Sequence, residues 1–283
     1  MNINANDVLK GLSERGIEAK TVEVRKNNAV LTGITPVNSQ GSVTSIVYLE
    51  SFDGIEAGLN EITDKIAKLL TAKAPSFDLN KILSKEYIEN NVFLRLAPEN
   101  TLKEDVIKKP SVLDGIDQYT SVNVMVNDQN GSIKVTDRIL KNAGITEDEL
   151  WDIAKKNTEK TFVYATERKI GGMIIPIHHV TNTNDTYGAS SILCADKIAD
   201  IVGKNFDGVA ICMPSSVHEM VMFPMMEDAT WEELNDMVNA VNSSEVHPEE
   251  QLGNRAYILT SDGKELEYQT AEEYFNEKGI DER

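Results

Sequence analysis

The stretch Met173–Pro224 constrains the fold of this 283-residue chain most, because it holds three of the four histidines, both cysteines and the longest apolar runs. An apolar run ending at Val180 is typical of a buried strand. The turn formers Thr181–Thr186 then interrupt regular structure. From Tyr187 the apolar residues recur at helical spacing, and Gly203 is placed to end that helix in a left-handed conformation. The stretch therefore predicts a strand, a polar loop and a helix in succession.

Hairpins are expected at three further places. After the helix, residues 208–213 and 217–223 are short apolar segments separated by Pro-Ser-Ser at 214–216, which predicts a hairpin turning at those three residues. Asn-Asn at 27–28 and Asp-Gly at 262–263 also separate β-rich segments, and these residue types tolerate the positive φ of a tight turn. Neighbouring strands of this chain should therefore pair mostly antiparallel.

Helical signals are interspersed among these strands. Apolar residues repeat every three to four positions over 55–73, and the Thr-x-x-Glu pattern of a capping box begins helices at Thr146, Thr230 and Thr270. No Gly-rich strand-to-helix loop of the dinucleotide or phosphate-binding type is present, and we expect no bound cofactor. The mixed order of elements predicts an α+β fold, with largely antiparallel sheets and packed amphipathic helices. We expect one α+β unit, and the alternative is two lobes, 1–112 and 113–283.

Charge excludes some classes of partner. Lys and Arg number 28 against 46 Asp and Glu, for a net charge of −18. This balance disfavours nucleic-acid binding through a basic face, which requires Lys and Arg to neutralise phosphates, and it equally disfavours anionic membrane surfaces. Met1–Lys10 lacks the basic start and apolar core of a signal peptide, and no apolar run approaches the roughly 20 residues of a spanning helix. With only two cysteines, which suit small buried positions, the sequence predicts a cytoplasmic protein.

The histidines raise the question of a metal site. His178 and His179 are adjacent on a predicted strand, so their side chains point to opposite faces and cannot easily chelate one ion together. One of them could join His218 if the two strands are neighbours. Because no spaced pair such as His-x-x-x-His is present, we expect no bound metal.

A serine hydrolase is the second chemical possibility. Ser215, Ser216, His218 and Glu219 are the residue types of a nucleophile, a base and an orienting group. Sequence neighbours rarely reach that geometry, because triad members normally come from separate elements. The pattern also matches neither Gly-x-Ser-x-Gly nor Ser-x-x-Lys. A hydrolase or a metal-dependent enzyme using these residues therefore remains an alternative to a binding role.

The polar loop Thr181–Thr186, together with Tyr187 and Gly188, is the third candidate. It precedes a predicted helix, and free backbone N–H groups at a helix start can hold an anion or a substrate carboxylate. Most helix N-termini have no such role, so the loop by itself indicates only where an anionic ligand would bind.

The chain resembles an uncharacterised bacterial family, domain of unknown function 5688, over its full length. The most specific blocks of this resemblance are 180–182 (VTN), 187–190 (YGAS), 214–219 (PSSVHE) and Met237–Glu250. The family is common in anaerobic Gram-positive bacteria and their mobile elements. The resemblance implies a single intracellular unit, and it brings no activity, cofactor or catalytic residue that can be transferred to this chain.

These observations together favour an intracellular, acidic binding protein whose partner is another protein, serving a mobile element or its host in regulation or defence. The expected binding surface consists of polar residues beside predicted strand ends: His179, Asn182, Ser215, Ser216, His218 and Glu219. The enzyme alternative predicts a serine near His218, or two histidines converging on one point. A further alternative, an acidic mimic of nucleic acid, predicts carboxylates arrayed over one face at phosphate-like spacing.

Overall fold

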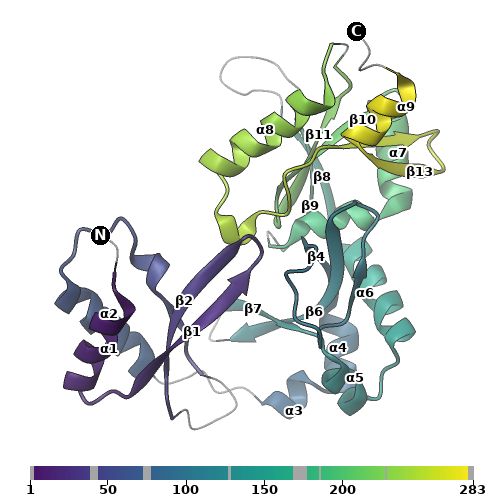
Figure 1. Ribbon diagram of the computed structural model, residues 1–283. Helices are drawn as coiled ribbons and strands as arrows, with labels where there is room; N and C mark the ends of the chain where they lie inside the picture. Colours follow the sequence, from purple (N-terminus) through teal and green to yellow (C-terminus); the bar gives the residue numbers. More distant parts are fainter. Residues whose placement is uncertain are drawn as a thin grey trace. The chain divides into compact units, whose positions relative to one another are not determined.

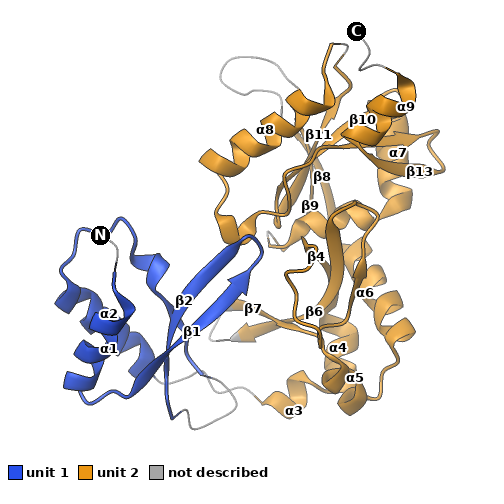
Figure 2. Ribbon diagram, viewed as in Figure 1, with its two compact units in different colours: residues 1–77 blue, residues 78–283 orange. Residues whose placement is uncertain are grey.

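The computed structural model describes residues 3–38, 44–72, 78–126, 129–167, 177–184, 186–226 and 228–279. The chain forms two compact units, Met1–Phe77 and Asp78–Arg283 (Figure 2). The strands form three sheets, and every strand pairing within them is antiparallel. The predicted α+β class with largely antiparallel sheets is thereby confirmed.

The first unit packs two helices against a small sheet. Its strands follow the order β1-β2-β3, and Asn27, with φ of +46°, makes the tight turn predicted between the first two. Apolar side chains of the helices and of the second strand form a separate core that includes Leu12, Ile34 and Ile66. The elements are α1 (Ala5–Glu14), β1 (Ala19–Lys26), β2 (Ala29–Pro36), β3 (Val47–Tyr48), η1 (Leu49–Phe52) and α2 (Leu59–Thr71).

The second unit begins with a four-stranded sheet, in which β6 pairs with three other strands. Helix α6 packs on β4, where the Thr158 hydroxyl accepts a hydrogen bond of 3.0 Å from the Leu94 backbone N–H. The elements of this part are α3 (Leu79–Ile82), α4 (Lys85–Asn91), β4 (Val92–Pro98), β5 (Lys108–Pro110), β6 (Ile116–Val126), β7 (Gln129–Lys134), α5 (Asp137–Ala143) and α6 (Glu147–Thr161).

A six-stranded sheet completes the second unit, in the order β13-β12-β10-β11-β9-β8. Side chains of alternate β10 residues lie on opposite faces of this sheet. Cys212 belongs to the core that includes α7, whereas Ile211 belongs to the core beneath α8 and α9 (Figure 1). The elements are β8 (Phe162–Glu167), β9 (Ile177–Asn182), η2 (Gly188–Leu193), α7 (Ala195–Asn205), β10 (Val209–Ser216), β11 (Glu219–Pro224), α8 (Trp231–Ser244), η3 (Pro248–Glu250), β12 (Tyr257–Ser261), β13 (Leu266–Thr270) and α9 (Ala271–Lys278).

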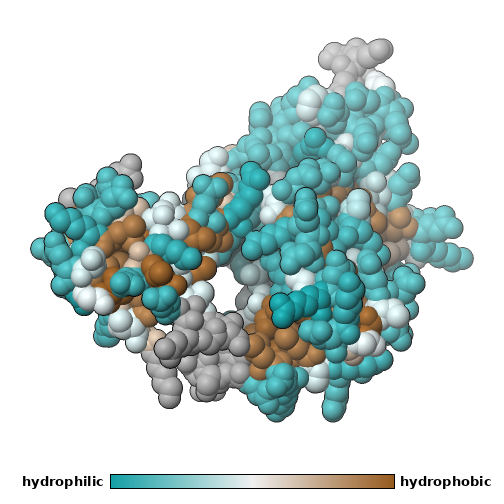
Figure 3. All heavy atoms as spheres, turned by 60° about the horizontal axis from the view of Figure 1, so that its bottom comes forward, coloured by the Kyte–Doolittle hydropathy of each residue, from teal (hydrophilic) through white to brown (hydrophobic). Residues whose placement is uncertain are grey.

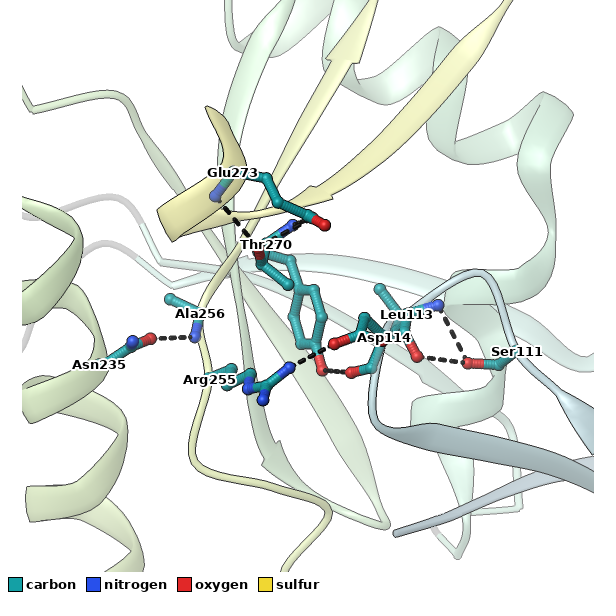
Figure 4. A network of polar contacts seen from close by, with 9 residues as sticks. Ser111, Leu113, Asp114, Asn235, Arg255, Ala256, Thr270 and Glu273 are labelled. Carbon is teal, nitrogen blue, oxygen red and sulfur yellow. Dashed lines mark hydrogen bonds and ion pairs between the residues drawn. The ribbon is translucent and has the colours of Figure 1, made fainter. Parts of the chain in front are cut away.

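Polar contacts and a shared core join the two sheets of the second unit. The Tyr257 hydroxyl donates a hydrogen bond of 2.7 Å to the backbone oxygen of Asp114, and Arg255 forms an ion pair with the same aspartate (Figure 4). Leu96 and Ile116 of the four-stranded sheet belong to the same apolar core as strands of the larger sheet. The two sheets therefore fold as one unit.

Several boundaries differ from those expected from sequence. Residues 1–77 and 78–283 form the two compact units, and β5 and β6 hydrogen-bond to each other across position 112, where the alternative of two lobes has its division. The hairpin of β10 and β11 turns at 217–218, since β10 continues through Ser216. Gly203 lies within α7 and does not cap it; a Cβ there would lie 3.0 Å from the Cα of Gly263, a tight contact that favours glycine.

Other local predictions are confirmed. All three predicted capping boxes are present, at Thr146, Thr230 and Thr270. The apolar run expected as a strand forms β9 from residue 177 onward, and residues 173–176 lie outside the described part. None of the described helices combines the length and the apolar character needed to cross a membrane. Hydrophilic residues cover most of the face drawn in Figure 3, and hydrophobic residues gather in smaller patches on it.

Candidate functional site

The six residues expected to form one surface fall into three separate hydrogen-bonded groups. In the first group, Glu219 lies between the other two members. Its Oε2 is 2.9 Å from Nδ1 of His179, and its Oε1 accepts a hydrogen bond of 3.4 Å from the Ser215 hydroxyl. A serine nucleophile needs the imidazole between the serine and the carboxylate. Because the carboxylate is in the middle here, His179 is not placed to act as the base for Ser215.

The second group is built around His218 at the tip of the β10–β11 hairpin. Its Nδ1 accepts a hydrogen bond of 3.2 Å from the backbone N–H of Tyr187, and its Nε2 lies 3.4 Å from Oε1 of Glu250. Its own backbone N–H donates a hydrogen bond of 3.0 Å to the Ser216 hydroxyl. The proton of the neutral ring therefore sits on Nε2. These contacts give His218 a positioning role: it holds the backbone of the neighbouring loop.

Asn182 forms the third group, and it shapes the polar loop singled out in the sequence. The residue is 3 % exposed. Its side-chain oxygen accepts a hydrogen bond of 2.9 Å from the Asn184 backbone N–H. Its side-chain amide donates a hydrogen bond of 3.0 Å to the backbone oxygen of Thr186. Gly188 ends the loop in close contact with β9 and with the hairpin tip: a Cβ there would lie 2.5 Å from the His218 oxygen. Only glycine fits that position.

This loop forms one wall of a cavity of about 350 Å³ within the second unit. The opposite wall comes from the β6–β7 hairpin, which is distant in sequence. The described lining residues carry amides, hydroxyls and a phenol, with one glycine, and none of them carries a carboxylate: Asn123, Asn130, Gly131, Ser132, Thr183, Asn184, Thr186 and Tyr187. In a chain with 46 acidic residues, such a neutral lining leaves room for an anionic ligand.

Arg95 supports both walls of this cavity from behind. It lies on β4, is 1 % exposed, and its Nη2 donates a hydrogen bond of 2.8 Å to the side-chain oxygen of Asn123. Its guanidinium carbon is 5.1 Å from the centroid of the Tyr187 ring and 5.4 Å from that of Phe93. The guanidinium is thus held between two aromatic rings and contacts one lining residue from each wall.

The charge of Arg95 has no counter-ion among the described residues. Burial lowers the pKa of its guanidinium to about 10, so the group remains protonated at neutral pH. Its Nε lacks a hydrogen-bond partner, as does the hydroxyl of Ser121, which is also buried and lies on the same face of the sheet. A buried charge without a partner is costly. The guanidinium therefore adds a positive charge, which no described carboxylate neutralises, beside a cavity whose described lining is neutral and polar.

Tyr187 is held in a strained conformation at the edge of the cavity. Its φ of +53° lies in the left-handed region, which costs energy for a residue with a large side chain. The bond from its N–H to His218 and the packing of its ring over Arg95 maintain this conformation. Surrounding structure that maintains backbone strain is characteristic of ligand-binding sites.

Among the described residues, the cysteines do not form a reactive centre. The thiols of Cys194 and Cys212 are buried, and burial raises the pKa of each to about 12, so neither is a thiolate at neutral pH. Across the described ranges, no group of three or more His, Cys, Asp or Glu residues is placed to hold a metal ion.

The sequence indicates the residues of one wall of the cavity and does not indicate that Arg95 lies behind it. The loop Thr181–Thr186 with Tyr187 was a candidate for holding an anion, and four residues of this segment line the cavity. Arg95 was not singled out, although a charged residue within the apolar run 92–97 is a signal that it sits in a strand for a specific reason. Its proximity to the loop arises only from tertiary packing.

Fold and cavity together define the class: an antiparallel α+β protein with a neutral polar cavity beside a buried arginine. The chain belongs to a family of unknown function, DUF5688, whose family model matches residues 3–261. This match confirms the resemblance recognised in the sequence. No curated protein and no solved structure gives a significant match to the chain.

Proposed function

We propose that this protein binds a small anionic ligand in the cavity between the β6–β7 hairpin and the loop residues 183, 184, 186 and 187. The observation that carries the proposal is the buried guanidinium of Arg95, which no described carboxylate neutralises and which contacts two lining residues. A ligand carboxylate or phosphate would supply the missing negative charge. The cavity volume of about 350 Å³ falls within the range of small-molecule sites, roughly 300–1,000 Å³.

A binding role fits the residues better than catalysis does. His218 uses both ring nitrogens in contacts with Tyr187 and Glu250, and Ser215 has a carboxylate, not an imidazole, as its partner. A general base needs a free acceptor within reach of the proton it removes. Binding of another protein, cytoplasmic location and a role in a mobile element or in defence stay predictions from sequence. An acidic mimic of nucleic acid likewise stays an untested alternative.

Calorimetric titration of the full chain tests the proposal, using inorganic phosphate, hexanoate, gluconate and glucose 6-phosphate at fixed ionic strength. The test variant is Arg95→Met, which removes the charge and keeps much of the side-chain volume. The matched control is Arg138→Met, which removes an exposed charge of the same unit on α5. Charge pairing across a partly desolvated site is worth on the order of 1–3 kcal/mol, so we expect at least ~5-fold weaker binding for the test variant alone.

Two results would overturn the proposal. One is that no anion of the panel binds the wild-type protein. The other is that Arg95→Met and Arg138→Met bind an anion equally well, because the buried guanidinium would then make no contribution. Circular dichroism of each variant confirms that the fold is retained before affinities are compared.

A further inference from the structure

We infer that the ligand of this cavity is a polyhydroxylated anion, that is, a sugar acid or a sugar phosphate. The inference rests on the proposed anion-binding function and specifies the chemistry of the remainder of the ligand. Arg95 accounts for one negative charge only, whereas the two walls present amides and hydroxyls over their whole extent.

The size of the cavity limits the ligand. A water molecule occupies about 30 Å³ in the liquid, so about 350 Å³ has room for roughly a dozen waters. A ligand of on the order of a dozen non-hydrogen atoms is therefore expected, which is the size of a six-carbon sugar acid. Inorganic phosphate or acetate alone would leave most of the wall groups without a ligand contact.

Side-chain groups on both walls could form hydrogen bonds to the hydroxyls of a ligand. The side-chain amides of Asn130 on the hairpin and Asn184 on the loop form no hydrogen bond to any described residue. Each primary amide offers two donors and an acceptor, which match the donor and acceptor character of a sugar hydroxyl. The Ser132 hydroxyl lies on the hairpin wall with the same dual character.

The aromatic lining argues against a nucleobase. Tyr187 is the one aromatic residue among the described lining residues. Its ring already packs with the Arg95 guanidinium at 5.1 Å and with the His218 ring at 5.7 Å. A planar base binds by stacking on an open ring face, and a sugar does not require one. The cavity thus provides polar contacts in place of a stacking platform.

Calorimetry with matched pairs of anions tests this inference. Gluconate is compared with hexanoate, which has the same chain length and no hydroxyls, and glucose 6-phosphate with inorganic phosphate. We expect the hydroxylated member of at least one pair to bind ~10-fold tighter or more, since each hydrogen bond contributes roughly two- to tenfold. The pair whose hydroxylated member binds more tightly then identifies the acid group of the ligand as a carboxylate or a phosphate.

Variants of the two walls locate the effect. Asn130→Ala and Asn184→Ala should each weaken binding of the hydroxylated ligand by roughly two- to tenfold more than they weaken binding of hexanoate or inorganic phosphate. Asn239→Ala, an exposed position on α8, is the matched control and should change neither.

The outcomes separate this inference from the function on which it rests. If hexanoate and inorganic phosphate bind as tightly as their hydroxylated partners and still require Arg95, the ligand class is wrong and the anion-binding function holds. If the hydroxylated anions bind more tightly but Asn130→Ala and Asn184→Ala have no effect, the inference is also overturned, because the sugar would then bind elsewhere. If no anion of the panel binds the wild-type protein more tightly than it binds Arg95→Met, the proposed function itself is refuted.

Discussion

Replacing Arg95 with Met should stabilise the unliganded protein, because the fold holds a buried charge for which no described residue supplies a counter-ion. Such a charge is expensive to keep in a protein interior unless it is paired, and apolar replacements of similar volume are often neutral or stabilising. If the guanidinium serves a ligand, its removal should improve the stability of the fold while binding is lost. A group that serves only the fold would show the opposite result.

The magnitude follows from the pKa of the guanidinium. Burial lowers this pKa to about 10. At about 1.36 kcal/mol per pKa unit, the lowering from the ordinary guanidinium value means that holding the charge costs on the order of 3 kcal/mol. The variant also loses the hydrogen bonds to Asn123 and to the Leu94 oxygen, together worth about 1–2 kcal/mol. The net expectation for Arg95→Met is a gain of about 1–2 kcal/mol.

The pH dependence has a definite sign. Since the folded-state pKa is depressed, the unfolded chain holds the proton more tightly, and the energetic penalty is complete at every pH well below 10. It is relieved only as the pH rises through about 10. The difference in stability between wild type and Arg95→Met should therefore stay constant between about pH 6 and 9 and become smaller above that range.

Urea unfolding followed by tryptophan fluorescence measures this difference. Both tryptophans, Trp151 and Trp231, lie in the unit that contains Arg95, so the signal reports on that unit. The exposed control Arg138→Met should stay within about 0.5 kcal/mol of wild type. A loss of more than about 1 kcal/mol in Arg95→Met, with the control unchanged, would show that the guanidinium is a net structural contact and would refute the reasoning.

Three further predictions concern the same unit. Gly188→Ala should destabilise the fold by about 1–3 kcal/mol, because its Cβ would overlap backbone atoms, whereas Gly253→Ala, which has open space around it, should have little effect; urea unfolding compares them. Burial lowers the pKa of His178 in the folded state, so protonation favours the unfolded chain. The stability of the fold should therefore decrease as the pH drops through the unfolded-state pKa of about 6.5. A pH series of melting temperatures in which His178→Gln shows the same decrease as wild type would contradict this. Because their thiols are buried with raised pKa values, Cys194 and Cys212 should react with a thiol reagent at pH 8 only after urea is added, and rapid labelling of the native protein would contradict that expectation.

Local features of the fold were predictable because they depend on residues close together in the chain. The Thr-x-x-Glu boxes at Thr146, Thr230 and Thr270 begin helices because each side chain satisfies backbone groups within four residues. Asn27 makes its predicted turn for a similar reason, since its side chain tolerates a positive φ. The antiparallel character of the sheets follows from the short turns between successive strands.

Boundaries were less predictable where distant contacts decide them. The sequence predicts one unit, with two lobes divided at 112 as the alternative, and β5 and β6 hydrogen-bond to each other across that position. Gly203 has the character of a helix end in the sequence, yet it lies within α7, where it packs closely against the backbone of Gly263. In each case a contact made across the fold overrides a local preference.

The sequence alone therefore determined the fold class, the helix starts at the three capping boxes, the tight turn at Asn27 and the position of a polar loop. Only the tertiary structure placed Arg95 behind that loop, because the arginine and Tyr187 are separated by 92 positions and meet through the packing of β4 against the loop and η2. It also separated Ser215 from His218, since a two-residue turn directs neighbouring side chains to different partners. Periodicity and turn chemistry act over a few residues, whereas a binding cavity depends on which distant strands pack together.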